Sequence, residues 1–107
     1  MKQIIKTFLP LVEYIDALPK RRRKEHISKL RDNIFKFLID LLLNVDRGHL
    51  PIDGATLEKL RPYKKIVCKL ISPKISLKAR KQQFQKRDYF KRLISPLIPV
   101  LQQALLS

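Results

Sequence analysis

The chain contains very little of several residue types that define common classes of small protein. Of its 107 residues, one is cysteine (Cys68), two are glycine and none is tryptophan. One cysteine excludes an internal disulfide, and so few glycines argue against a turn-rich β fold. A lone thiol fits a reducing compartment, where we expect Cys68 to fill a small space in the core or at its edge.

Long apolar runs and catalytic motifs are also missing. No window of 18 apolar residues exists, so the sequence predicts no membrane-spanning helix. Pro10 and Glu13 interrupt the first apolar run and no cleavage site follows, so we expect an intracellular protein without a signal peptide. His26 and His49 stand apart from other metal ligands, and neither a phosphate loop nor a nucleophile motif occurs. We therefore expect no metal, no cofactor and no enzymatic activity.

Positive charge is what the chain has in excess. Its 24 lysines and arginines outnumber nine acidic residues, which gives a net charge of +15. Residues 20–36 hold eight basic residues against two acidic ones, and residues 61–92 hold twelve against one. Residues 37–60 are net acidic by two, and residues 93–107 carry no charge. Such basic blocks favour a polyanionic partner, because each neutralised phosphate releases condensed counterions.

Apolar residues follow helical spacing along most of the chain, which predicts an all-α, compact bundle of five or six short helices in one domain, 1–107. We expect a first helix at 3–18, which Pro10 kinks or restarts, and then a short basic helix opened by Pro19. The longest apolar stripe, over 27–45, predicts the central helix. Its most buried residues should be Ile34, Leu38, Leu41 and Leu42.

Turn and capping signals divide the second half of the chain. Gly48 should end the central helix, residues 48–54 should form a loop, and Asp53 should cap a helix over 55–60. After Pro62, a helix should bury the stripe of Tyr63, Ile66, Val67 and Leu70. A break at Ser72-Pro73 should precede a helix at 77–86 capped by Ser76, and a last helix at 88–106 should be bent or split by Pro96 and Pro99.

The basic blocks are the candidate binding site. Five consecutive cations at 20–24 are typical of a nuclear-targeting or nucleic-acid patch, or else of a solvated helix end. In the second block, cations alternate with core positions, so folding should collect them on one surface. Four aromatic residues of this block could stack on bases, but their helical spacing favours the core: Tyr63, Phe84, Tyr89 and Phe90. The predicted phosphate-binding residues are Lys20, Arg21, Arg22, Arg23, Lys24, Arg61, Lys64, Lys65, Lys69, Lys78, Arg80 and Lys81.

The uncharged segment 93–107 allows two interpretations. Its one-sided apolar stripe favours a core helix that closes the bundle. Alternatively, with the cations just before it, the segment would form an interfacial amphipathic element that contacts a membrane or a partner. It is too short and too often interrupted by proline to span a bilayer.

Three segments carry a family resemblance. Leu42–Ile52 ends in Gly-His-Leu-Pro-Ile, Leu60–Lys65 reads Leu-Arg-Pro-Tyr-Lys-Lys, and Lys74–Lys81 reads Lys-Ile-Ser-Leu-Lys-Ala-Arg-Lys. With the hydrophobic C-terminus, this series resembles small basic proteins of Polinton/Maverick elements and adintoviruses, which are likened to basic core or minor virion peptides of adenoviruses. The resemblance covers residues 35–107 and implies a virion- or transposon-associated protein. The chain departs from the family pattern by lacking a glycine-rich tail and by carrying the cluster at 20–24.

These observations predict a non-enzymatic protein that binds nucleic acid, DNA in preference to RNA, through phosphate contacts with little base readout. Condensation or packaging in a nucleus or virion is the expected role. Two alternatives stay open. One is a helical protein-interaction module, like a death domain or a transcription-factor-interaction bundle, that binds an acidic protein or itself. The other is a membrane-active virion peptide.

Overall fold

A computed structural model describes residues 2–50 and 52–106, and within these residues every regular element is a helix. The elements form six continuous helical runs, which confirms the all-α prediction. Pro51, in the predicted loop, and Ser107, at the end of the predicted uncharged helix, lie outside the described residues. The runs are α1 (Lys2–Ala17); α2 (Lys20–Ser28); α3 (Asp32–Asp46); α4 (Gly54–Leu60) with η1 (Arg61–Tyr63) and α5 (Lys64–Leu70); α6 (Leu77–Lys86); and η2 (Phe90–Ile94) with η3 (Ser95–Leu97) and α7 (Ile98–Leu106).

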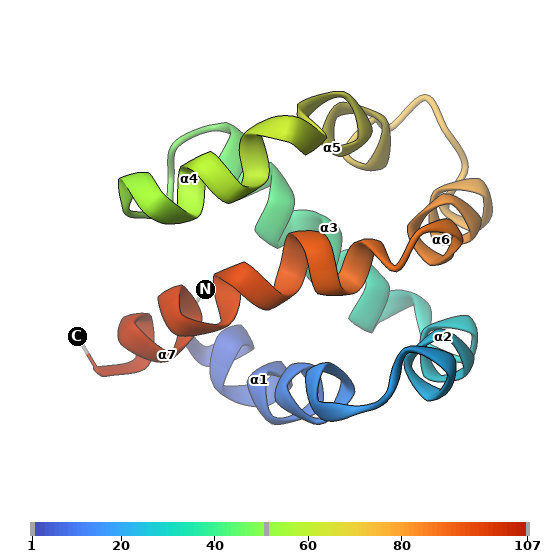
Figure 1. Cartoon of the computed structure of the whole chain (residues 1–107), viewed down its shortest axis with the longest axis horizontal. Coiled ribbons are helices and arrows are strands. Elements are labelled where there is room, and N and C mark those ends of the chain that lie inside the picture. Colours follow the sequence, from blue (N-terminus) through green and yellow to red (C-terminus); the bar gives the residue numbers. More distant parts are fainter. Residues whose placement is uncertain (1, 51, 107) are drawn as a thin grey trace.

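The last run crosses the middle of the molecule in front of α3, with α1 on one side of it and α4 and α5 on the other (Figure 1). Helix α1 packs against α7, and α6 packs against both α2 and α5. The molecule measures 33 × 26 × 23 Å along its principal axes. This arrangement brings α2, α5 and α6, which carry 12 of the 24 lysines and arginines, to the same end (Figure 1).

Helix α3 is the central helix, as predicted. Leu38, Leu41 and Leu42 are at most 1% exposed, but Ile34 is only partly buried, so the prediction for that residue was wrong. Its neighbour Phe35 is fully buried instead and packs edge-on against Phe84 of α6, with ring centroids 5.6 Å apart. The larger aromatic side chain therefore fills the interior at the start of the helix.

The predicted helix at 27–45 begins too early, because the chain breaks between Ser28 and Asp32. The Ser28 hydroxyl donates to the Glu25 carbonyl at 2.6 Å, and Arg31 is extended with φ −67° and ψ 152°. The Lys81 ammonium of α6 donates to the Leu30 carbonyl inside this break. Residue spacing cannot reveal a hydrogen-bond partner 51 positions away. The apolar stripe continues past the end of α2, so spacing alone predicted one helix where the structure has a break.

The turn after α3 is a helix end of the Schellman type. Gly48 has φ +73°, and its backbone N–H donates to Val45, while that of His49 donates to Asn44 at 2.8 Å. These two bonds occupy carbonyls that the last turn of α3 would otherwise leave open. The predicted role of Gly48 is confirmed.

Both predicted N-caps are also confirmed. The Asp53 carboxylate accepts from the Thr56 backbone N–H at 2.7 Å, and the Ser76 hydroxyl accepts from the Ala79 N–H at 3.2 Å. Hydrogen bonds from the Thr56 side chain and backbone lower the pKa of Asp53 from its ordinary value. The caps set where α4 and α6 begin and so fix the angle at which each helix leaves its loop.

Prolines act differently in the first and last runs. Pro10 is exposed inside α1, which continues as one α-helix, whereas Pro96 and Pro99 accompany a change from π to 3₁₀ to α geometry over 90–106. Leu93, Leu97 and Leu101 are fully buried, so the apolar stripe of this run faces the core. No helix in the described part of the chain is both long and apolar enough to cross a membrane.

Cys68 is exposed, so the prediction that it packs in the core or at its edge was wrong. The inward side of α5 is defined by Ile66 and Leu70, which are 8% and 0% exposed. Position 68 lies about 200° around the helix from position 66, at about 100° per residue, and therefore faces outward.

Candidate nucleic-acid interface

Two basic segments that are distant in the sequence meet where α5 and α2 flank the end of α6. An open hollow of about 300 Å³ between α5 and the end of α6 is lined by four cations, with Tyr89 and Ile66 among its other residues. The cations are Lys65, Lys69, Lys86 and Arg87. Among the described residues that line it, none is acidic, so nothing at this hollow competes with an incoming anion.

A second hollow, of about 170 Å³, lies between α2 and α6 and is lined by Lys20, Lys24 and Lys86, together with Asp88. Lys86 therefore belongs to both hollows and joins them. Lys24 also lines a third hollow, of about 320 Å³, together with Arg21 and Glu25. We call the cations of these hollows the basic surface: Lys20, Arg21, Lys24, Lys65, Lys69, Lys86 and Arg87.

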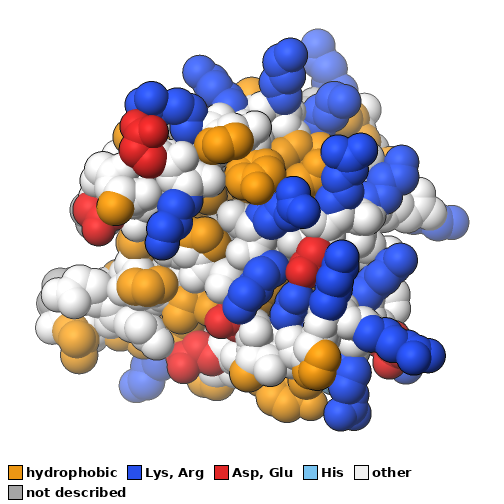
Figure 2. Space-filling model, in the orientation of Figure 1, with side chains coloured by type: hydrophobic (Ala, Val, Ile, Leu, Met, Phe, Trp, Pro, Cys, Tyr) orange, Lys and Arg blue, Asp and Glu red, His pale blue; other side chains and the backbone are white. Residues whose placement is uncertain are grey.

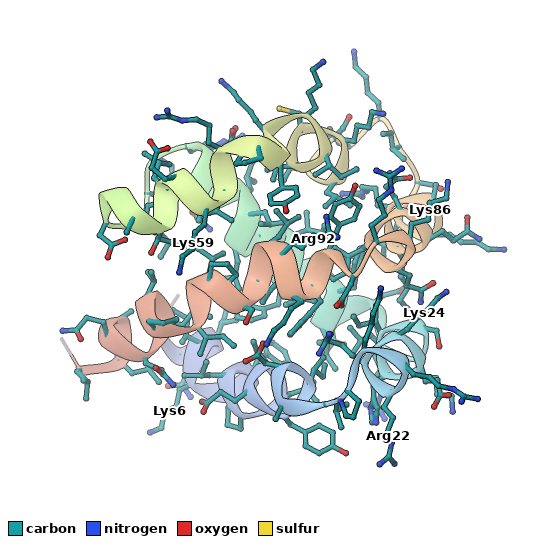
Figure 3. All side chains as sticks on the ribbon, viewed as in Figure 1. Lys6, Arg22, Lys24, Lys59, Lys86 and Arg92 are labelled. Atoms are coloured by element: carbon teal, nitrogen blue, oxygen red, sulfur yellow. The ribbon has the colours of Figure 1, made fainter. Side chains whose placement is uncertain are left out.

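The figures show the same gathering of charge. Blue side chains cover the end of the molecule formed by α2, α5 and α6 (Figure 2). Lys24 and Lys86 extend from α2 and α6 on that same side (Figure 3). Lysines are flexible point charges, so this surface can follow a phosphate chain without fixed geometry.

Two acids among the described residues line the basic hollows, Glu25 and Asp88, and Asp88 is paired inside the protein. Arg23 of α2 holds Asp88 with two hydrogen bonds, Nε to Oδ1 at 2.8 Å and Nη2 to Oδ2 at 2.6 Å. A third bond runs from Arg23 Nη1 to the Leu18 carbonyl at 2.6 Å. The two charged side chains are 6% and 15% exposed, and the hydrogen bond to Asp88 raises the pKa of Arg23. The pair fastens α2 to the start of the last helical run.

Lys91 is paired in a similar way, outside the basic surface. Its ammonium lies 3.0 Å from Asp16 of α1, which also accepts from the Ser95 hydroxyl at 2.5 Å. Partial burial raises the pKa of Asp16, but the hydrogen bonds from Ser95 and Lys91 outweigh it and leave that pKa below its ordinary value. This contact ties α1 to the last helical run.

Three of the twelve predicted phosphate-binding residues serve the fold instead. Arg23 is buried, and Arg80 and Lys81 are half-buried and donate to the carbonyls of Leu70 and Leu30. One signal for Arg23 was present in the sequence, because it lies four residues before Ile27 and so shares its inward face. The carbonyl partners of the other two residues depend on tertiary packing.

The remaining predicted residues divide between two sides of the molecule. Lys20, Arg21, Lys24, Lys65 and Lys69 belong to the basic surface. Arg61 and Lys64 instead border an apolar groove between α3, α4 and α5. Arg22 and Lys78 are exposed.

The sequence-based site omitted Lys86 and Arg87, which belong to the same basic block. Their place at the end of the predicted helix 77–86 was visible, but only the packing of α6 between α2 and α5 makes Lys86 the connecting residue.

The aromatic residues are core residues more than stacking platforms. Phe84 and Phe90 are fully buried and Tyr89 is 7% exposed, which confirms the core expectation for these three. Tyr63 is half-buried, and the Arg92 guanidinium lies 5.9 Å from its ring centroid. Among these four residues, little aromatic face is therefore open to a base.

In the residues that the structure describes, no three histidine, cysteine or acidic side chains lie together as a metal site would require. No protein-family model matches the chain, and no curated protein or solved structure matches it either.

Proposed function

We propose that this protein binds nucleic acid through its phosphates, using the basic surface. The observation that carries the proposal is the place of Lys86 in two adjoining hollows, because it joins cations of α2 to cations of α5. Each phosphate that such a surface neutralises releases counterions, and this release supplies most of the affinity of sequence-independent binding.

The chemistry of the surface favours contact with the backbone over contact with bases. Six of its seven cations come from three helices and one follows the end of α6, and five of the seven are lysines, which attract phosphate without the planar geometry of an arginine–guanine pair. The aromatic rings that line its hollows, Phe84 and Tyr89, are buried, so they offer little face for stacking. Binding should therefore be indifferent to sequence, as condensation or packaging requires.

DNA is the proposed polymer, and the resemblance to small basic proteins of Polinton/Maverick elements and adintoviruses adds the proposed setting of a virion or a nucleus. In either setting the basic surface would bind the phosphates of the polymer in the same way. A salt series with duplex DNA and duplex RNA of the same sequence would decide between the two polymers.

The test is a salt series with two unrelated DNA duplexes, using the variants Lys86→Glu and Lys78→Glu. Both lysines lie on α6 and are exposed, and both substitutions change the net charge equally, but Lys78 lines none of the three basic hollows described above. For the unaltered protein, log affinity should fall linearly with log salt, with a slope of about −0.9 per phosphate contacted.

Lys86→Glu should weaken binding to both duplexes alike and flatten the slope by about one contact or more, while Lys78→Glu should have a much smaller effect. Equal effects of the two variants would show that only net charge matters, and they would rule out the basic surface as a specific binding site. Unchanged affinity in Lys86→Glu would remove the proposal itself.

A further inference from the structure

A groove of a different character lies away from the basic hollows, between α3, α4 and α5. It encloses about 450 Å³, more than any of the basic hollows. Its walls are apolar side chains from all three helices, and three charged residues complete its lining. The apolar residues are Leu42, Val45, Leu57, Leu60 and Val67, and the charged residues are Asp46, Arg61 and Lys64.

Among the described apolar residues of the groove, one has an exposed side chain, which is set against buried and half-buried ones. Leu57 of α4 is 48% exposed, while Leu42 and Leu60 are buried and form a firm wall behind it. A concave, aliphatic surface between helices is the usual receptor for an amphipathic helix, which inserts apolar side chains spaced at i, i+4 and i+7.

The charged residues of the groove indicate the sign of the charge that a partner should carry. Lys64 is exposed, and no ion pair to it occurs in the part of the chain that the structure describes. Arg61 pairs with Glu58 at 2.9 Å, but both side chains are more than 60% exposed, so this pair contributes little and can exchange for a partner's carboxylate. Two cations on the side of η1 and α5 therefore face one acid on α3.

The same charges disfavour two other occupants. A second copy would bring another chain with a net charge of +15 close to the first, and the repulsion between the chains opposes association. Nucleic acid gains nothing from aliphatic walls, and among the described residues only two cations, Arg61 and Lys64, line the groove.

We propose that this groove binds an amphipathic helix of an acidic protein partner. Apolar side chains of that helix would fill the space against Leu57, Leu60 and Val67, and its carboxylates would meet Lys64 and Arg61. The site is independent of the basic surface, so one molecule would bind nucleic acid and this partner together.

The experiment is a display selection on the full-length chain. The probes are helical peptides with leucine or phenylalanine at i, i+4 and i+7 and random choices of Glu, Lys, Gln and Ala elsewhere. Excess duplex DNA at low salt would occupy the basic surface and leave the groove free. We expect the enriched peptides to carry glutamate. Leu57→Ser should lower their affinity about tenfold or more, because a central anchor of the groove is lost.

Ile4→Ser is the matched control, because Ile4 is also 48% exposed but lies on α1. It should leave peptide affinity unchanged, and Lys64→Glu should shift the selection away from glutamate. Thermal unfolding would verify that both serine variants fold.

Three results would overturn the proposal. One is the enrichment of no peptide, or of neutral or basic peptides. Another is binding that survives Leu57→Ser but is lost in Lys86→Glu, which would place the peptides on the basic surface. The third is dimerisation of the unaltered chain that Leu57→Ser abolishes, which would make a second copy the occupant.

Discussion

The basic surface and the apolar groove are built differently although they share helix α5. Lys65 lines a basic hollow, whereas Lys64, the residue before it, lines the groove. Successive residues of an α-helix point about 100° apart, so one step along the chain moves a cation to another side of the molecule. Proximity in sequence is therefore a poor guide to a shared site, even within a run of lysines.

Acidic residues differ as much as basic ones between the two regions. At the basic surface, Asp88 pairs with Arg23, and among the described residues Glu25 is the one other acid that lines these hollows. At the groove, Asp46 and the Glu58–Arg61 pair keep opposite charges side by side. The first region is suited to a uniform polyanion, and the second to a partner whose charges are patterned.

One of the two largest effects that we predict is on stability, and it concerns the ion pair of Arg23 with Asp88 next to the basic surface. Replacing Arg23 with Ala leaves Asp88, which is only 15% exposed, without its partner, and this should cost about 3 kcal/mol of unfolding free energy. Arg22→Ala, an exposed neighbour, should change stability by less than about 0.5 kcal/mol. Urea unfolding measures both values. Adding Asp88→Asn to Arg23→Ala should recover part of the loss, and a loss that stays the same would contradict this explanation.

A substitution in α3 should affect both regions together, because this helix lies behind the groove and supports the core. Leu41 is fully buried, and Leu41→Ala should cost about 2–5 kcal/mol. Leu57→Ala, at a half-exposed site in the groove, should cost far less. Comparable unfolding midpoints for the two variants would show that α3 is not the central helix.

Lys64→Glu and Lys65→Glu sharpen the comparison most directly, since they alter adjacent residues by the same charge. Lys65→Glu should reduce DNA affinity and flatten the salt slope by about one contact, while leaving binding of glutamate-rich helical peptides intact. Lys64→Glu should do the reverse. Fluorescence anisotropy with labelled DNA and labelled peptide measures both affinities. If the two variants lose the same affinities, the basic surface and the groove are one binding region.

The smallest predicted effect lies outside both regions, at Asp16. Its pKa is lowered in the folded protein, so its contribution to stability is present above the ordinary value of 3.8 and is lost as pH falls through the lower folded pKa. Asp16→Asn should remove that part of the acid dependence and cost less than about 1 kcal/mol at neutral pH. Thermal unfolding between neutral pH and pH about 3 tests this. An acid dependence equal to that of the unaltered protein would contradict it.

Local signals in the sequence predicted most of the fold. Gly48, Asp53 and Ser76 have short-range roles that depend on neighbours within a few residues, and all three were predicted. The break before Asp32 was missed because part of what holds it, the Lys81 ammonium, arrives from another helix. Where a boundary depends on tertiary contact, periodicity alone extends the helix too far.

The sequence predicted that the candidate site is basic, but it did not fully predict which basic residues form it. Charge counting located the two basic blocks, yet it could not tell that Arg23 turns inward or that Lys64 borders an aliphatic groove. It also could not single out Lys86, whose importance comes from the packing of α6 between α2 and α5. The apolar groove gave no sequence signal, because its leucines and valines have the spacing of ordinary core residues.

The lysines around the paired Asp88 also have a thermodynamic consequence for the free protein. Like charges held within a radius of gyration of 12.9 Å repel one another, and unfolding lets them separate. Dissolved salt screens this repulsion and should raise the unfolding free energy, while the same salt weakens a complex held by counterion release. Ionic strength thus acts in opposite directions on the fold and on the complex. A bound polyanion should raise the melting temperature most where the free protein is least stable, at low salt.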